Sequence, residues 1–192
     1  MRAWQTISWL LPALLALAPQ TAPAQAPAAP AAPTRAQLLR GEYGKLRANN
    51  DLLYYHLDVK VDPDAKTIAG KNTISFRMLN DDTKIQIDLY ENLAVDKILM
   101  GKTALKYTRE LNAVFIEFPE TLKAGREVSI DFYYSGTPKT IGRFGGFTFG
   151  KDPAGRPWIF TACEGEGSSI WWPSGIPRPR GWRSKGAAPE AC

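Results

Sequence analysis

Histidine and cysteine are scarce in this sequence. Its 192 residues include one histidine, His56, and two cysteines, Cys163 and Cys192. Zinc sites in proteins use three or four histidine, cysteine or carboxylate ligands that lie close together. A single imidazole on a strand-like segment forms no such cluster, so we expect the chain itself to bind no metal and no other cofactor.

Motifs for phosphate binding and for nucleophilic catalysis are also missing. None of the glycine-rich segments has the spacing of a phosphate-binding loop or of a dinucleotide-binding turn. Ser168, Ser169 and Cys163 lie in no segment that resembles a nucleophile elbow. The sequence therefore predicts no catalytic residue of these classes.

Positive charge is concentrated at the two ends of the chain. The formal net charge is +5, but residues 174–192 carry four basic residues and one acidic residue, and Arg2 adds another positive charge. A central segment that is almost neutral has no basic face to contact phosphates. This distribution argues against nucleic acid as a partner.

The first 24 residues have the layout of a signal peptide. Arg2 precedes an apolar stretch from Trp9 to Ala18, and Ala22-Pro23-Ala24 is a cleavage site of the small-x-small kind. The alternative is an uncleaved membrane anchor, but the apolar stretch is shorter than the ~20 residues that a spanning helix needs. We expect cleavage near Ala24, export to the periplasm or the extracellular space, and no stable membrane anchor.

Residues 25–50 are expected to form a spacer and a short helix. Residues 25–34 are a Pro/Ala tract that should run extended and solvated. Apolar residues in 34–50 recur at helical spacing, which predicts one short amphipathic helix weakened by Gly41 and Gly44.

From Asp51 onward the apolar residues recur with a period of two. One face of the first run holds Tyr55, Leu57, Val59 and Val61, and the other holds His56, Asp58 and Lys60. Similar runs follow at 67–78, 85–89, 95–100, 113–118 and 128–134. Short polar links and the absence of long helical crossovers predict an all-β domain over 51–173, built as an antiparallel sheet or sandwich.

Glycines alternate with large aromatic residues beyond Gly136. A turn at Asp152-Pro153-Ala154-Gly155 should fold this segment into a hairpin. Glu164 and Glu166 follow among small and aromatic residues. A carboxylate at the mouth of an apolar pocket can bind an ammonium group. The alternative is that both residues are ordinary loop charges.

Three segments, 54–63, 68–76 and 122–132, resemble in order and spacing the N-terminal domain of aminopeptidase N-type zinc metallopeptidases, the gluzincins of peptidase family M1. The loop Thr161–Gly165, followed by Ile170-Trp171-Trp172-Pro173, resembles the segment through which that family contributes an acidic or amide residue to its active site. The resemblance runs from about Leu52 to Pro173.

This resemblance implies a saddle-shaped antiparallel β domain that packs on a thermolysin-like catalytic domain. Glu164 would bind the free α-amino group at the N-terminus of a peptide substrate, whereas Glu166 has no matching role. The family holds zinc with a His-Glu-x-x-His motif and a further glutamate, and has a Gly-x-Met-Glu-Asn segment near the substrate amine. None of these occurs here, so we expect a fragment of a zinc aminopeptidase, truncated before the catalytic domain and inactive by itself.

Composition changes at Ser174, where the family continues into an acidic stretch and this chain has a basic, Pro/Arg-containing tail. We hypothesise that residues 174–192 arise from a frameshift or an interrupted gene and are disordered. Two alternatives remain for the function. The chain could be an exported module that binds carbohydrate or protein through Trp158, Trp171 and Trp172, or a fragment that docks on a separately encoded catalytic domain.

Overall fold

The computed structural model describes residues 32–41, 43–142, 145–165 and 167–175. Apart from Ala32, all of them belong to one unit, Pro33–Cys192. The predicted signal peptide, most of the Pro/Ala spacer and the tail from residue 176 lie outside the described residues. Within the described part of the chain, no helix has the length and apolar character required to cross a membrane.

Two short helices precede the strands, where the sequence predicts one. They are α1 (Arg35–Gly41) and α2 (Lys45–Ala48). The Gln37 N–H donates to Thr34 Oγ1 at 3.3 Å and the Thr34 N–H donates to Gln37 Oε1 at 2.7 Å, a reciprocal cap that starts α1. The prediction of a single helix is wrong because α1 ends at Gly41 and Gly44, with an extended backbone, starts a new helix.

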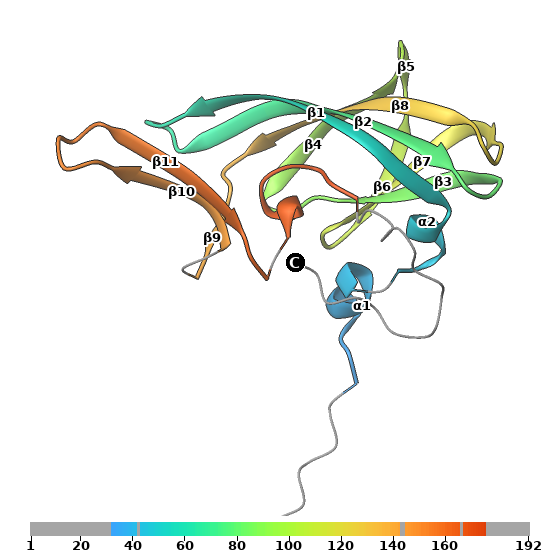
Figure 1. Ribbon diagram of the computed structural model, residues 1–192, viewed down its shortest axis with the longest axis horizontal. Helices are drawn as coiled ribbons and strands as arrows, with labels where there is room; N and C mark the ends of the chain where they lie inside the picture. Colours follow the sequence, from blue (N-terminus) through green and yellow to red (C-terminus); the bar gives the residue numbers. More distant parts are fainter. Residues whose placement is uncertain (1–31, 42, 143–144, 166, 176–192) are drawn as a thin grey trace, which may run out of the picture. The chain divides into compact units, whose positions relative to one another are not determined.

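Eleven strands among the described residues form three antiparallel sheets (Figure 1). The five-stranded sheet has the order β1 (Asn50–Asp62), β2 (Thr67–Met78), β8 (Glu127–Gly136), β4 (Leu93–Met100), β5 (Thr103–Ala104). A three-stranded sheet has the order β3 (Asp82–Asp88), β7 (Ala113–Leu122), β6 (Lys106–Glu110). The other consists of β11 (Pro157–Cys163), β10 (Gly145–Lys151) and β9 (Thr140–Ile141), and a 3-10 turn, η1 (Ser168–Ile170), follows it. The prediction of an all-β antiparallel fold is confirmed.

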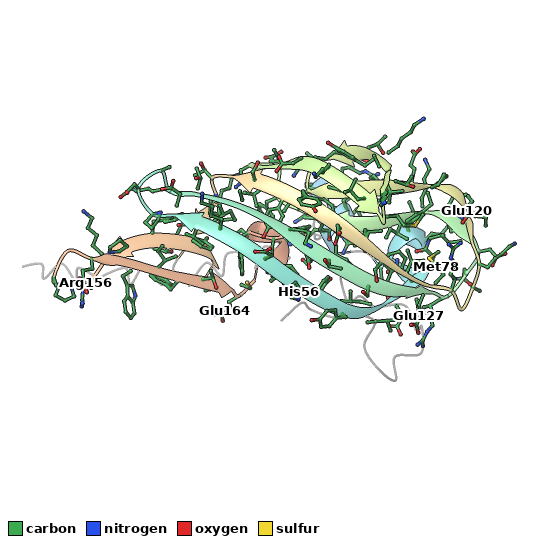
Figure 2. The ribbon with its side chains drawn as sticks, turned by 90° about the horizontal axis from the view of Figure 1, so that it is seen from above. His56, Met78, Glu120, Glu127, Arg156 and Glu164 are labelled. Atoms are coloured by element: carbon green, nitrogen blue, oxygen red, sulfur yellow. The ribbon has the colours of Figure 1, made fainter. Side chains whose placement is uncertain are left out.

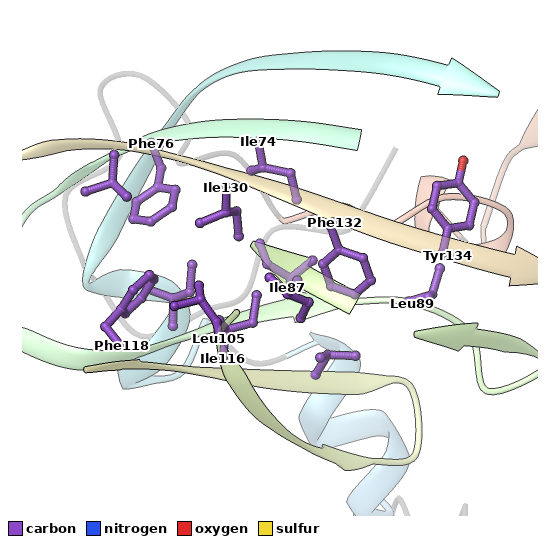
Figure 3. Packing of buried hydrophobic residues seen from close by; sticks show 14 of the residues in the cluster. Ile74, Phe76, Ile87, Leu89, Leu105, Ile116, Phe118, Ile130, Phe132 and Tyr134 are labelled. Atoms are coloured by element: carbon purple, nitrogen blue, oxygen red, sulfur yellow. The ribbon is translucent and has the colours of Figure 1, made fainter. Parts of the chain in front are cut away.

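Alternating residues of the first two sheets form the hydrophobic core. In Figure 3, Ile74, Ile130 and Phe132 point from the five-stranded sheet toward Ile87 and Ile116 of the β3-β7-β6 sheet. Ile74 and Ile130 lie directly opposite each other on β2 and β8, and both are almost completely buried. Because each such side chain stabilises the fold by about 1.5–3 kcal/mol when fully buried, this inward-facing row sets the register of the central strands.

Strand β1 follows the predicted alternation with one irregularity. Tyr55, Val59 and Val61 pack against the core, as expected, while Leu57 remains 37% exposed. The pairing with β2 shifts by one residue between Leu52 and Tyr54. Such a bulge lets Leu52 as well as Tyr55 face the core.

Replacing Ile130 with alanine should lower the free energy of unfolding by about 2–5 kcal/mol, because the vacated volume lies between two sheets that cannot collapse fully. Urea denaturation followed by tryptophan fluorescence measures the change. Lys60→Ala, on the exposed face of β1, serves as the control and should change stability by less than about 0.5 kcal/mol. Equal effects of the two substitutions on the free energy of unfolding would show that Ile130 is not part of the core.

Candidate functional site

The hairpin of β10 and β11 carries Glu164 at one of its ends. Asp152 closes the opposite end: its Oδ1 accepts hydrogen bonds from the N–H groups of Ala154 and Arg156, each at 2.9 Å. These backbone bonds, together with the Arg156 side chain, lower the pKa of Asp152. Gly155 has φ +80°, which suits glycine. The predicted turn is confirmed, and Figure 2 shows Arg156 and Glu164 at opposite ends of the hairpin.

Glu164 lies in a tight turn immediately after β11. The Gly167 N–H donates to the Cys163 carbonyl at 3.0 Å, and both Gly165 (φ +76°) and Gly167 (φ +77°) adopt conformations that favour glycine. The Glu164 side chain is exposed, and within the described ranges its carboxylate has no hydrogen-bond or ion-pair partner. The turn therefore exposes the Glu164 carboxylate to solvent. Glu166 lies outside the described residues.

An aromatic cluster supports the segment that follows this turn. The Trp171 ring lies edge-on to Phe147 of β10 at 5.6 Å between centroids and to Trp172 at 6.1 Å. Trp172 in turn meets Tyr55 of β1 edge-on at 4.8 Å. These contacts connect the hairpin, the loop and the five-stranded sheet, and such ring pairs contribute about 0.5–1.5 kcal/mol each beyond their buried area.

The chain returns to the core directly after the tryptophans. Asn72 Nδ2 donates to the Pro173 carbonyl at 2.8 Å. Asp88 and Ser174 exchange two backbone hydrogen bonds, at 2.8 and 2.9 Å, and the Gly175 N–H donates to the Tyr55 hydroxyl at 2.6 Å. Ser174 and Gly175, which the sequence analysis places in the tail, are thus bound to the β domain.

A buried ion pair lies beside this return point. Arg47 of α2 is 4% exposed, and its Nη2 lies 2.6 Å from Asp88 Oδ2. Gln86 Nε2 donates to Asp88 Oδ1 at 3.0 Å and to the Leu39 carbonyl at 3.1 Å, and Arg47 Nη2 also donates to the Leu39 carbonyl. Burial raises the pKa of Asp88 to about 6, because the loss of hydration outweighs the attraction of Arg47 and the hydrogen bond from Gln86. Sequence reasoning missed this cluster, since an acidic residue at the end of an alternating run carries no sign of burial.

The three tryptophans proposed as a binding platform do not share a surface. Trp158 and Phe160 lie on the exposed face of β11, with 61% and 46% of their surface accessible. Trp171 packs on Phe147, which pairs with Thr161 and therefore lies on the opposite face of the hairpin. The structure contradicts a single platform of these three tryptophans, through which the alternative module was expected to bind carbohydrate or protein.

Comparison with known proteins identifies the family. The family model of the peptidase M1 N-terminal domain matches residues 52–175. Because the match covers more than half of the sequence, the chain belongs to the peptidase M1 N-terminal domain family. A search of the curated proteins finds no match.

Solved structures share this fold at low sequence identity. An M1 zinc metallopeptidase mutant from Deinococcus radiodurans, bound to a Tyr-Ser-Ala substrate, is similar with a TM-score of 0.53 and 19% identity, over 66% of this chain and 29% of that chain. Native yeast LTA4 hydrolase is similar with a TM-score of 0.54 and 13% identity, over 66% of this chain and 21% of that one. The chain thus spans less than a third of these enzymes.

The name of the Deinococcus radiodurans enzyme includes zinc, and a zinc site needs three or four histidine, cysteine or carboxylate ligands that lie close together. Across residues 32–175, apart from the gaps given above, no three histidine, cysteine or acidic side chains come close enough to hold a metal ion. His56 is exposed on the outer face of β1, where the Tyr54 hydroxyl lies 3.5 Å from its Nδ1.

The buried ion pair predicts an unusual pH dependence of stability. The pKa of Asp88 is about 6 in the folded chain, above its ordinary value of 3.8, so the folded chain binds the Asp88 proton more tightly than the unfolded chain does. The stability that this proton adds is full below about pH 4 and is lost as pH rises through about 6. The difference in unfolding free energy between the wild type and Asp88→Asn should therefore fall by about 1.4 kcal/mol or more between pH 4 and pH 7, the equivalent of at least one pKa unit. Urea titrations at several pH values measure this difference.

Ser75→Ala on β2 changes no titratable group and is the control for this experiment, so its difference in unfolding free energy from the wild type should stay constant with pH. A wild-type advantage over Asp88→Asn that is constant, or that grows as pH rises, would contradict the raised pKa.

Proposed function

We propose that this chain is the N-terminal recognition and structural domain of a zinc aminopeptidase, and that Glu164 binds the free α-amino group of a peptide. The observation that supports this most directly is the exposed Glu164 carboxylate, which has no partner among the described residues. It lies in a glycine turn inside the range that the M1 N-terminal family matches.

The chemistry of this group suits recognition of a chain end. A carboxylate and an ammonium group form a charge-assisted hydrogen bond, whereas an internal peptide amide carries no charge with which to form one. A fixed acidic residue therefore discriminates a free N-terminus from the interior of a peptide. Because the metal-binding motifs of the family are absent from the sequence, hydrolysis would require residues of a separate catalytic domain.

The same proposal includes export and docking. The leader at residues 1–24 would direct the chain out of the cytoplasm, and a catalytic domain would pack against this β domain. Exposed Trp158 and Phe160 support docking, because adjacent large apolar side chains on a surface commonly mark a contact with another protein. A covering domain would also exclude water from the Glu164 turn and so strengthen its interaction with an amine.

Titration of the ¹⁵N-labelled chain with the tripeptide Tyr-Ser-Ala tests the role of Glu164. We expect saturable chemical-shift changes at the amides of Gly165 and Gly167, and at least about tenfold weaker binding to Glu164→Gln, which corresponds to about 1.4 kcal/mol of lost charged hydrogen bonding. N-acetylated Tyr-Ser-Ala should give no comparable shifts.

Glu120→Gln is the control for this titration, because Glu120 is an exposed acidic residue on β7. Its replacement should leave the affinity unchanged. Equal affinity of the wild type and Glu164→Gln, or equal binding of the acetylated peptide, would contradict the proposed role.

A further inference from the structure

Helix α1 precedes the range that matches the M1 family, yet it contacts the candidate site. The family match begins at residue 52, whereas α1 spans Arg35–Gly41. Arg40, in its last turn, donates from Nη2 to the carbonyl oxygen of Gly165 at 2.5 Å. Gly165 directly follows Glu164 in the sequence. A segment outside the family domain is therefore hydrogen-bonded to the turn that carries the proposed amine-binding residue.

Two anchors hold the helix that carries Arg40. At the start of α1, Arg35 Nε and Nη2 donate to the two carboxylate oxygens of Glu110 on β6, at 2.7 and 2.8 Å. Near its end, the Leu39 carbonyl accepts hydrogen bonds from Arg47 and Gln86. The residue before Arg40 is thus fixed to the buried ion pair, so the guanidinium extends from an element that is restrained at both ends.

Among the described residues of the turn, Cys163–Gly165 and Gly167, one backbone hydrogen bond closes the turn. Its backbone makes the Gly167 to Cys163 hydrogen bond, while Gly165 and Gly167 add backbone freedom because neither carries a side chain. The Arg40 bond fixes the peptide carbonyl one residue after Glu164. A bond from a charged donor at this point limits the directions in which the Glu164 carboxylate can point.

We propose that Arg40 is a positioning residue for Glu164, and that the α1–α2 segment braces the amine-binding turn from outside the family domain. The role of Glu164 in this statement rests on the proposed function above. The stabilisation of the turn by Arg40 can be measured with or without a bound peptide.

Hydrogen exchange and peptide binding by the full-length ¹⁵N-labelled chain test the brace. In Arg40→Ala, exchange of the Gly167 amide should rise about tenfold, because opening of the turn no longer breaks a second bond. Exchange of the Ile130 amide in the core should not change. The affinity for Tyr-Ser-Ala should fall about fivefold, which is less than for Glu164→Gln, because the carboxylate is retained but less well oriented.

Two further variants separate a brace from a general loss of stability. Arg40→Lys keeps a charged donor and should restore Gly167 exchange to within about threefold of the wild type. Arg156→Ala removes the same residue type at the other end of the hairpin (Figure 2) and should change neither Gly167 exchange nor affinity.

The outcomes distinguish this proposal from the one on which it rests. The proposed role of Arg40 is contradicted if Gly167 exchange is unchanged in Arg40→Ala. It is also contradicted if Arg156→Ala raises Gly167 exchange equally, or if Ile130 exchange rises equally in Arg40→Ala. None of these results contradicts the role of Glu164. If the wild type does not bind Tyr-Ser-Ala, the role of Glu164 fails, and selective, lysine-rescued exchange at Gly167 still establishes Arg40 as a brace of the turn.

Discussion

The backbone pair between Asp88 and Ser174 is the contact on which the site depends. It closes the loop that begins after β8 and contains the hairpin, the Glu164 turn and both loop tryptophans. Asn72 and Tyr55, from the five-stranded sheet, bind the residues on either side of Ser174. The turn that carries Glu164 is therefore not a free surface loop, because the chain is bound to the core a few residues after it.

The ion pair between Asp88 and Arg47 connects the Asp88–Ser174 contact to the helices at the start of the domain. Burying Asp88 costs hydration energy, and the charge of Arg47 together with the amide of Gln86 offsets part of that cost. Arg47 belongs to α2, which precedes the family match, so a residue from outside that match helps to hold the loop in place. The same helices reach the turn through Arg40. One network thus joins the start of the domain, its core and its candidate site.

Alternation along the sequence predicted six of the strands, and the turn at Asp152 predicted the hairpin, because both are local properties. Strands β5, β6 and β9 were not predicted. The glycine-rich surroundings of Glu164 predicted a loop, and the resemblance to the family singled this residue out, but its exposure is known only from the structure. The Asp88–Arg47 pair and the packing of Trp171 could not be predicted, since each depends on residues far away in the sequence. The break between α1 and α2 at Gly44 had a visible signal in its glycines, but the sequence did not show that it would divide the helix.

Hydrogen exchange at the Ser174 amide most directly tests whether the chain is bound to the sheet at Ser174. The Ser174 N–H donates to the Asp88 carbonyl at 2.9 Å in a site where Ser174 is 5% exposed. We expect this amide to exchange nearly as slowly as the core amides of β8, because both then open only with the whole domain. Exchange at the rate of an unstructured peptide would show that the chain does not return to the sheet at Ser174, and would contradict the account of how Glu164 is held.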